Sequence, residues 1–482
     1  MIEWVLRAAE GLDQLLWGPW TVVFIAAVSL YLSYRTRLFQ VRRLGFIVRS
    51  TVGSLTTTRD RSEKSGALPA SRDRAAKRGR MTPLQATSTA LASTVGMGSI
   101  AGIATALSVG GPGSILWMWI LALFGTITKT AEITLAVHYR DIDETGRIRG
   151  GPMYYIRRGL NWPLLATLFS LGIFINALFS ASLLQGHTVG RSFLVTYGVN
   201  PYVVTAVMIF VTAIVVIGGL RRIGRVSEAL VPLMSFVYVA GGLVLFIVNY
   251  REIPAVFGQI VHYAFAPAPA VGGFAGAAVF QALQTGMARG MFSNEAGMGT
   301  APMAHATADT RHPLQQGMWG AFEVFVVTFV ICTITSFAIL STGVLSSGQS
   351  GIELVITAFS SVFPESIASN LISFCILTFC LSTQIGFFVY FETATVNLFG
   401  RDKTRYVRWL YFIPPVLFAG VADVDRIWVF ANIAVGVCAI PNLIAVLALS
   451  GIFLMLMRDY ITGDLRYATA AVDASKRYLR RG

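Results

Sequence analysis

Charged side chains are scarce in this chain. Asp, Glu, Lys and Arg together make up 13% of its 482 residues, whereas a soluble domain carries about 25%. The hydrophobic share is 55%, and the mean hydropathy is +0.65. A single membrane anchor on a soluble domain cannot produce such values over a whole chain. At about 20 residues per membrane-spanning helix, roughly ten to twelve spans fit this length.

Cysteine is also rare, and the common sequence signatures of catalysis are missing. The four cysteines fall inside apolar runs, without the spacing of a metal site or a disulfide framework, and are read as small packing residues. The sequence contains no HExxH, no CxxC pair, no nucleotide-binding P-loop and no Ser-His-Asp arrangement. We therefore expect no enzyme, no ATP-driven pump and no covalent cofactor.

The apolar runs predict about eleven membrane-spanning helices. The first run follows Glu3, Glu10 and Asp13 rather than a basic start, so we interpret it as a retained helix and not as a cleavable signal peptide. The expected spans are 18–34, 84–107, 114–137, 163–184, 202–218, 228–248, 273–298, 317–341, 369–391, 409–422 and 427–457.

Basic residues are distributed unevenly over the loops between these spans. The chain has 38 Lys and Arg against 24 Asp and Glu, a net charge of +14. Of the 38, 32 lie in loops on one side of the expected membrane, four lie on the other side, and Lys129 and Arg289 lie inside spans. Because cytoplasmic loops are enriched in Lys and Arg, this split predicts an outside N-terminus and a cytoplasmic C-terminus in the plasma (inner) membrane. The excess of positive charge is therefore explained by membrane topology, and its distribution argues against a nucleic-acid partner.

The first basic loop, 35–82, has a polar second half, TTTRDRSEKSGALPASRDRAAKRGR. One interpretation is a disordered loop that only fixes topology. The other is regulated contact with anionic headgroups of the lipid bilayer.

Two spans differ from the rest because glycine and polar residues interrupt them. The second span contains TVGMGS at 94–99, and the seventh contains Gly286 and Gly290 among Gln281, Gln284, Arg289, Asn294 and Glu295. Irregular backbone at membrane depth is tolerated only inside protein or beside a wet cavity. The alternative for the second span is close helix packing through small residues. For the seventh span we expect a break near Gly286 and Gly290.

The positions of these two spans predict an inverted repeat. They begin two five-helix halves, 83–248 and 273–457, and run in opposite directions, as in transporters built around broken helices. The remaining parts are an extra N-terminal helix (1–34), the basic loop (35–82), an extracellular connection (249–272) and a cytoplasmic tail (458–482). Amides near Gly98 would suit a carboxylate. Freed carbonyls near Thr94 and Val95 would suit an ammonium group or a sodium ion.

Several stretches together resemble the alanine or glycine:cation symporter family, the sodium:alanine symporters. They are TVGMGSIAGIATALSVGGPGS (94–114), KTAE (129–132), GGPMYYIRRGL (150–160), ARGMFSNEAGMGTAPMAHATADTRHPLQQG (288–317), STQIGFF (382–388) and IPNLI (440–444). The resemblance implies an all-α polytopic membrane protein with a leucine-transporter-like 5+5 inverted repeat. It also implies sodium-driven uptake of a small neutral amino acid.

Three positions depart from the family pattern. Met97 replaces a threonine and Ser99 replaces an asparagine in the broken stretch, and Phe387 replaces a tryptophan. The resemblance also places Phe179 where relatives carry a glutamine-containing motif in the fourth span. Met97, Phe179 and Phe387 would form apolar walls, which predicts a preference for alanine or a slightly larger apolar amino acid over glutamine.

The candidate site residues follow from the broken spans and from the resemblance. The expected substrate-binding residues are Gly96, Met97, Gly98, Ser99, Phe179, Gln284, Thr285, Gly286, Met287 and Phe387. The expected cation-binding residues are Thr94, Val95, Ser382 and Thr383, because oxygen ligands suit a hard cation. The alternative for Ser382 and Thr383 is bonding back to their own helix, and for Gln284 and Thr285 it is contact between helices.

Charges inside the spans are candidates for gating or structural roles. Lys129 and Glu132 are three residues apart and can share one helix face. Arg289 and Glu295 are expected on the cytoplasmic side of the seventh-span break, as an inner gate. Glu323, at an expected helix end, is interpreted together with Glu392 as an ordinary interface charge.

The sequence thus predicts a secondary transporter that brings a small neutral amino acid, of alanine or glycine type, into the cytoplasm with sodium by alternating access. The alternatives are a proton-coupled or exchanging transporter of glutamine or serine, and a transporter-derived sensor. No particular oligomeric state is predicted.

Overall fold

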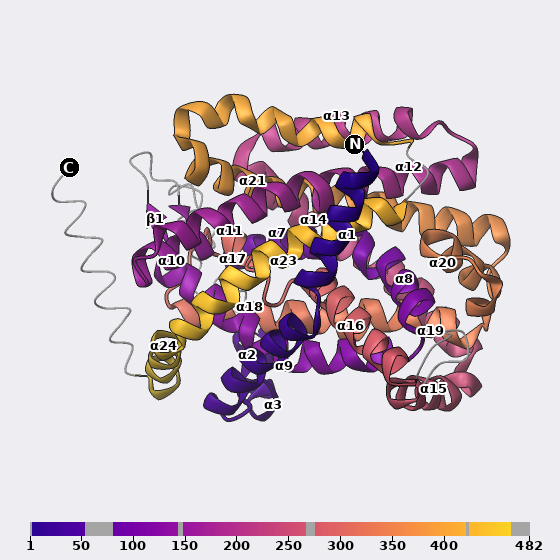
Figure 1. The fold of residues 1–482 in the computed structure, drawn as a ribbon, viewed down its shortest axis with the longest axis horizontal. Helices are drawn as coiled ribbons and strands as arrows, with labels where there is room; N and C mark the ends of the chain where they lie inside the picture. Colours follow the sequence, from indigo (N-terminus) through magenta and orange to yellow (C-terminus); the bar gives the residue numbers. More distant parts are fainter. Residues whose placement is uncertain (1, 54–80, 143–147, 267–274, 421–423, 464–482) are drawn as a thin grey trace, which may run out of the picture.

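The computed structural model describes residues 2–53, 81–142, 148–266, 275–420 and 424–463, and these are almost entirely helical (Figure 1). The helices of the first half are α1 (Ile2–Leu16), α2 (Pro19–Arg35), α3 (Phe39–Arg42), α4 (Leu44–Ser50), α7 (Pro83–Thr94), α8 (Ala101–Gly110), α9 (Ser114–His138), α10 (Pro152–Gly159), α11 (Pro163–Asn176), α12 (Leu184–Tyr197), α13 (Pro201–Ile217) and α14 (Gly219–Val248). Strands β1 (Asp141–Ile142) and β2 (Ile148–Arg149) form a short antiparallel pair.

The second half continues the helical pattern. Its helices are α15 (Ile253–Phe265), α16 (Ala275–Asn294), α17 (Ala301–His305), α18 (Pro313–Val324), α19 (Thr333–Ser341), α20 (Gly351–Ser360), α21 (Glu365–Val407), α22 (Ile413–Leu417), α23 (Val424–Ala448) and α24 (Ser450–Thr462). Two π-helical segments, η2 (Ala177–Leu183) and η4 (Phe325–Cys332), join α11 to α12 and α18 to α19. Short 3₁₀ segments are η1 (Met97–Ser99), η3 (Tyr250–Glu252), η5 (Val344–Ser347) and η6 (Arg408–Phe412).

Many of these helices suit a lipid bilayer. Within the described residues, seven helical stretches are long and apolar enough to cross a membrane: Arg7–Arg35, Ser114–His138, Pro163–Tyr197, Gly219–Val248, Pro313–Ser341, Glu365–Leu417 and Ile427–Ala448. The shorter apolar helices α8, α13 and α20 accompany them. This confirms a polytopic all-α membrane protein, while the count of eleven spans remains a prediction.

The expected ninth and tenth spans form a helical hairpin. The backbone of Gly400 leaves the helical region with φ 80° and ψ 172°, and this divides the stretch Glu365–Val407 at that residue. The chain then returns along itself, so that the Tyr411 hydroxyl donates to the carbonyl oxygen of Gln384 at 2.9 Å. The returning helical segment therefore begins at Arg401, earlier than the expected residue 409.

Segments expected on one face of the membrane lie together at one end of the molecule. In Figure 1, β1, α10 and α24 lie at one end, and α15, α19 and α20 lie at the other. Ring contacts join Phe46 of α4 and His312 to Tyr460 of α24. Most of the basic loop 35–82 and most of the tail 458–482 lie outside the described residues.

The second and seventh spans are both broken, as predicted. Helix α7 begins with a capping box between Thr82 and Gln85 and ends at Thr94, and α8 starts only at Ala101. Helix α16 runs without interruption past Gly286 and Gly290 to Asn294.

The predicted position of the second break was therefore wrong, because the break lies at 295–300. Three residues there have positive φ, namely Glu295 (57°), Gly297 (95°) and Gly299 (74°). Glycine adopts positive φ angles readily, and a residue with positive φ commonly ends an α-helix. Gly286 and Gly290 instead pack against Ser114 and Met118 of α9, which is the role of small residues at a helix contact.

Candidate functional site

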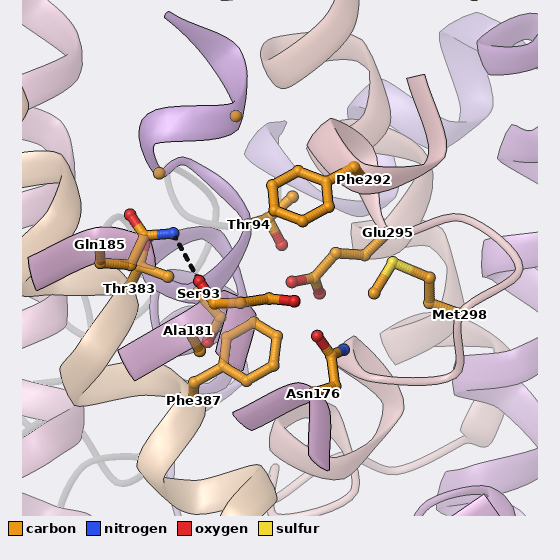
Figure 2. A pocket seen from close by; sticks show the side chains of 13 residues that line it. Ser93, Thr94, Asn176, Ala181, Gln185, Phe292, Glu295, Met298, Thr383 and Phe387 are labelled. Carbon is orange, nitrogen blue, oxygen red and sulfur yellow. Dashed lines mark hydrogen bonds between the residues drawn. The ribbon is translucent and has the colours of Figure 1, made fainter. Parts of the chain in front are cut away.

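A cavity lies where the two broken spans meet the fourth and ninth spans (Figure 2). The space between the atoms of its lining residues totals about 310 Å³, which includes open solvent. The lining residues are Ser93, Thr94, Gly96, Gly98, Asn176, Ser180, Ala181, Gln185, Phe292, Glu295, Met298, Thr383 and Phe387. These residues are almost all buried, and their close packing favours a small ligand.

The Glu295 carboxylate points into the middle of this cavity (Figure 2). The residue is 2% exposed, and its backbone has the left-handed conformation that non-glycine residues rarely adopt. Its amide donates to Met291 at 2.8 Å, and its carboxylate accepts from the Thr300 hydroxyl at 2.7 Å. Such strained residues persist where their surroundings hold them, and they cluster at ligand sites. Glu295 was expected in a gate, and the structure places it in the cavity wall.

The fourth span contributes two amide side chains that sequence analysis did not single out. Asn176 is buried in the cavity lining, and its side chain lies within hydrogen-bonding reach of the Cys438 thiol. Gln185 accepts from the Met97 amide at 3.2 Å and donates to the Ser180 carbonyl at 3.2 Å. Between them lies the π-helical segment η2, a feature frequent at functional sites. Polar amides within an apolar span were a signal that could have identified both residues.

A cluster of oxygen atoms lies between α7 and α21, at one side of the cavity. The Ser382 hydroxyl is 3.1 Å from the carbonyl oxygen of Ala92 and 2.8 Å from that of Phe379. The Thr383 hydroxyl is 3.5 Å from the carbonyl oxygen of Val95 and 2.9 Å from that of Phe379. Five oxygens, two hydroxyl and three carbonyl, therefore converge from two helices. Neutral oxygens in this number suit a hard monovalent cation.

Each of the Ser382 and Thr383 hydroxyls bonds back to its own helix and also reaches a carbonyl of the α7 segment, so the alternative interpretation is confirmed and the cation site stays a prediction. A hydroxyl donates one hydrogen bond and keeps lone pairs free. The expected contribution of Thr94 is different: its hydroxyl donates to Ala90 at 2.8 Å, and its carbonyl accepts from the Gly96 amide at 3.0 Å. The carbonyls of Ala92 and Phe379 had not been predicted.

Glycine permits the close approach of the two helices at this cluster. A Cβ atom added to Gly96 would lie 2.5 Å from the Thr383 hydroxyl oxygen. On α21, a Cβ at Gly386 would collide with the Ser93 hydroxyl of α7. Side chains at either position would separate the carbonyls of α7 from the hydroxyls of α21.

Behind the cavity, a buried charge network connects four helices. Lys129 of α9 forms an ion pair with Glu323 of α18 at 3.0 Å, and both side chains are fully buried. His305 of α17 contacts the second carboxylate oxygen of Glu323 at 2.6 Å. Gln316 joins His305 at 2.7 Å to the Thr87 hydroxyl of α7 at 3.4 Å. The interpretation of Glu323 as an interface charge was therefore wrong.

Glu132 is also buried, one helical turn from Lys129, but its close polar contact is Asn442 of α23. The Asn442 amide donates to the Glu132 carboxylate at 2.6 Å and to the Gly297 carbonyl in the break at 2.8 Å. The Tyr155 hydroxyl donates to the same Asn442 side chain. Lys129 donates to the carbonyl of Asn294, just before the break, at 2.7 Å, whereas Glu132 reaches Gly297 within the break through Asn442.

The other expected substrate-binding residues lie outside the cavity lining. Ser99 contacts the Ser293 hydroxyl at 3.1 Å, and Met97 faces the wall only through its amide. Phe179 stacks on Phe430 at 5.5 Å. Gln284 donates to the carbonyl of Trp17 at 2.6 Å, Thr285 lies against Gly110, and Gly286 and Met287 are packed in the core.

Arg289 lies before the break rather than at it. Its guanidinium group stacks over the ring of Trp428 at 3.7 Å and contacts the Asn432 side chain at 3.4 Å. A cation over a tryptophan face is a stabilising contact. Arg289 and Glu295, expected as one gate, therefore belong to different surroundings.

Comparison with known sequences gives several relatives that are similar over most of their length. "Sodium/alanine symporter AgcS" of Methanococcus maripaludis is 32% identical, covering 91% of this chain and 94% of the relative. "Probable sodium/glutamine symporter GlnT" of Bacillus subtilis is 35% identical, covering 95% and 91%. "Uncharacterized transporter YflA" of B. subtilis is 35% identical, covering 97% and 96%.

Comparison with solved structures supports the same fold. The crystal structure of MhsT in complex with L-phenylalanine matches with a TM-score of 0.56 and 14% identity, covering 76% of this chain and 88% of MhsT. This confirms the leucine-transporter-like arrangement of helices. The sodium:alanine symporter family profile matches residues 2–470. The chain therefore belongs to the sodium:alanine symporter family.

Proposed function

We propose that this protein is a sodium-coupled symporter that carries a small neutral amino acid into the cytoplasm by alternating access. The observation that carries the proposal is the five-oxygen cluster between α7 and α21, directly beside the cavity of the broken helices. Thr383 belongs to both the cluster and the cavity lining. A cation bound there would hold α7 against α21 and so fix one wall of the substrate cavity. Coupling of ion and substrate follows from this shared wall.

The cavity offers a partner for each charged group of an amino acid. The Glu295 carboxylate would bind the α-ammonium group, since an ionised carboxylate accepts strong charge-assisted hydrogen bonds. The amides at the start of the outer half-helix, near Gly98, would bind the α-carboxylate. The Asn176 amide, which lines the cavity, would offer a hydrogen bond to the bound substrate or to a water beside it. Phe292, Met298 and Phe387 would enclose the side-chain end.

The names of relatives include an alanine and a glutamine symporter, so the substrate must be decided on this chain. We favour alanine or glycine because the cavity is closely packed and Ala181, Phe292, Met298 and Phe387 give it an apolar side. Leaving a polar substrate side chain unpartnered there would cost about 1–3 kcal/mol. If glutamine binds, the amides of Asn176 and Gln185 are the groups in the lining that would contact its side chain.

The test is uptake of radiolabelled alanine into proteoliposomes with and without an inward sodium gradient. We expect concentrative uptake only with the gradient, and competition in the order alanine or glycine ahead of serine and glutamine. Sodium-dependent substrate binding without any uptake would instead indicate a sensor. Uptake that ignores sodium would remove the symport assignment.

Proton coupling is the second candidate, and the buried carboxylate of Glu295 inside the cavity favours it. A relative named "Putative sodium/proton-dependent alanine carrier protein YrbD", from B. subtilis, is 29% identical over 93% of this chain. A pH-sensitive dye trapped in sodium-free proteoliposomes separates the two candidates. Alanine-driven acidification of the lumen would support proton coupling, and its absence together with sodium-dependent uptake would exclude it.

A further inference from the structure

A second cavity lies at the end of the molecule that holds β1 and α10, away from the substrate cavity. It contains about 530 Å³ of space, which includes open solvent. Its lining comes from three elements that are distant in sequence: the β1–β2 pair, α10 and the end of α21. The lining residues are Asp141, Arg149, Tyr154, Arg157, Val396, Asn397 and Arg401. No residue of the two broken spans or of the five-oxygen cluster lines this second cavity.

Positive charge dominates this lining. It contains three arginines and one acidic residue, and the carboxylate of Asp141 is engaged by Arg158 at 2.7 Å. Within the described part of the chain, neither Arg149 nor Arg157 has an ion-pair partner within 4.0 Å. The guanidinium groups of Arg149 and Arg157 share a concave surface and repel each other, and the one carboxylate of the lining is paired with Arg158, so an anion between the two groups would be stabilised.

Neutral hydrogen-bonding groups complete the lining. Asn397 is held by the hydrogen bond of its amide to the Ser170 hydroxyl of α11 at 2.7 Å. Burial raises the pKa of the Tyr154 hydroxyl, and the nearby charges of Arg149, Arg157 and Arg158 act in the opposite direction. The Tyr154 hydroxyl therefore remains a hydrogen-bond donor and lies within the field of these guanidinium groups.

We propose that this cavity, formed by β1–β2, α10 and the end of α21, binds a phosphate group. Planar guanidinium groups match the oxygens of phosphate in paired hydrogen bonds, and the hydroxyl of Tyr154 can add a further one. The group could be supplied by the headgroup of an anionic membrane lipid or by phosphate free in solution. A lipid headgroup and free phosphate present the same phosphate oxygens to the cavity, so an experiment must distinguish the two sources.

The position of the cavity links its occupancy to the transport machinery. Arg140, immediately before β1, donates to the backbone carbonyls of Ala306 and Ala308 at 3.2 and 2.7 Å, just after α17. At the other end of the hairpin, Gly151 packs against Met303 within α17. A phosphate bound between α10 and α21 would thus stabilise the β1–β2 segment, which contacts α17, the short helix after the break in the seventh span.

The test measures thermal unfolding of the full-length detergent-purified protein at constant sodium concentration. The probes are inorganic phosphate and short-chain phosphatidylglycerol, each compared with chloride at the same ionic strength and with short-chain phosphatidylcholine. The double variant Arg149→Gln/Arg157→Gln removes the two unpaired guanidinium groups. The control Arg42→Gln/Arg43→Gln removes the same charge from exposed positions of the basic face, far from the cavity lining.

We expect at least one probe to raise the unfolding temperature of the wild type and of the control. The half-saturating concentration should rise at least tenfold in the double variant, because it loses the two charged groups that would donate to the phosphate oxygens. Stabilisation by phosphatidylglycerol alone identifies a lipid site, and stabilisation by inorganic phosphate identifies a soluble ligand. If the double variant does not fold, Tyr154→Phe, which loses only a hydroxyl, should still weaken the response severalfold. No stabilisation of the wild type by either probe, or equal loss in both double variants, would overturn the proposal.

Discussion

The Lys129 ammonium group donates to the backbone carbonyl oxygen of Asn294 at 2.7 Å, at the last residue of α16. The final carbonyls of a helix carry partial negative charge and lack partners within the helix, so a cation there is stabilising. Because Glu295 is the next residue, this contact of Lys129 also helps to hold the backbone that carries the Glu295 carboxylate. The same lysine pairs with Glu323, whose other oxygen contacts His305 of α17. One network therefore connects both halves of the broken seventh span.

Removing the charge of Lys129 should destabilise the protein strongly. Lys129→Met leaves Glu323 buried without its cation, and breaking such a pair costs about 3–5 kcal/mol. The double variant Lys129→Met/Glu323→Gln should recover much of that loss. Thermal unfolding in detergent measures both variants. The exposed pair Arg191–Glu353 supplies the control, since Arg191→Gln should cost about 1 kcal/mol or less. Equal effects of Lys129→Met and Arg191→Gln would contradict the structural role.

Thr383→Val should weaken sodium binding while leaving the shape of the side chain nearly unchanged. The loss of one ligand oxygen should cost about 1.4 kcal/mol or more, which is at least tenfold in sodium affinity. The sodium dependence of alanine uptake measures this. The matched control is Thr378→Val on the same helix, because Thr378 bonds only to backbone carbonyls of α21, at Phe374 and Cys375. Unchanged sodium dependence of Thr383→Val would refute the cation site.

Gly96→Ala should impair sodium coupling through crowding rather than through loss of a ligand. Its Cβ would lie 2.5 Å from the Thr383 oxygen, so α7 and α21 must separate. We expect a rise of at least tenfold in the sodium concentration that half-saturates uptake. Gly102→Ala in the same broken span is the control, because the nearest atom to its Cβ is 3.6 Å away on Trp428. A wild-type sodium response of Gly96→Ala would show that this contact does not set the site.

Glu295→Gln separates a binding role from a gating role. If the carboxylate binds the substrate ammonium group, the neutral amide should lower equilibrium affinity for alanine at least tenfold, because charge-assisted hydrogen bonds are about twice as strong as neutral ones. If Glu295 acts only in a gate, affinity stays the same and turnover slows. Binding of radiolabelled alanine to purified protein decides between them. Glu365→Gln, at the exposed start of α21, controls for loss of a carboxylate.

The sequence predicted the helical class and the breaks because both depend on local composition. Apolar runs favour helices, and the glycines of TVGMGS allow a break, through local effects on the backbone. These effects can be predicted without knowing which other segments pack against them. The position of the second break was ambiguous for the same reason. Gly286 and Gly290 satisfy the same compositional rule as Gly297 and Gly299, and only contact with α9 shows that the first pair serves packing.

Side-chain partners could not be predicted in the same way. Glu323 looked like an interface charge because its cation, Lys129, lies far away in the sequence on another span. The five-oxygen cluster between α7 and α21 was only half predicted, because a sequence shows which residues carry hydroxyls but not which backbone carbonyls will meet them. The carbonyl oxygens of Ala92 and Phe379 enter only through the packing of α7 on α21.

Phe387→Trp should shift substrate preference towards the smallest amino acids. Phe387 lines the cavity and packs edge-on against Tyr390 at 4.9 Å, so a larger ring at this position extends into the space between the broken helices. The cavity then loses room at its apolar side, while the Glu295 carboxylate and the amides near Gly98 are unchanged. Glycine and alanine should therefore keep their affinity better than larger amino acids.

Competition against labelled alanine uptake, with glycine, serine, leucine and glutamine as competitors, measures this ranking in the wild type and in Phe387→Trp. Phe179→Trp is the matched control, because Phe179 stacks on Phe430 outside the cavity lining and its enlargement should leave the ranking unchanged. If glutamine competes best in the wild type, the polar amides Asn176 and Gln185 select the substrate and the apolar wall does not. If the ranking moves in Phe179→Trp but not in Phe387→Trp, the side-chain end of the substrate lies towards the fourth span. A shift confined to Phe387→Trp places that end against the ninth span, beside the five-oxygen cluster. The size of the substrate would then act directly on the wall that a sodium ion bound at this cluster would hold.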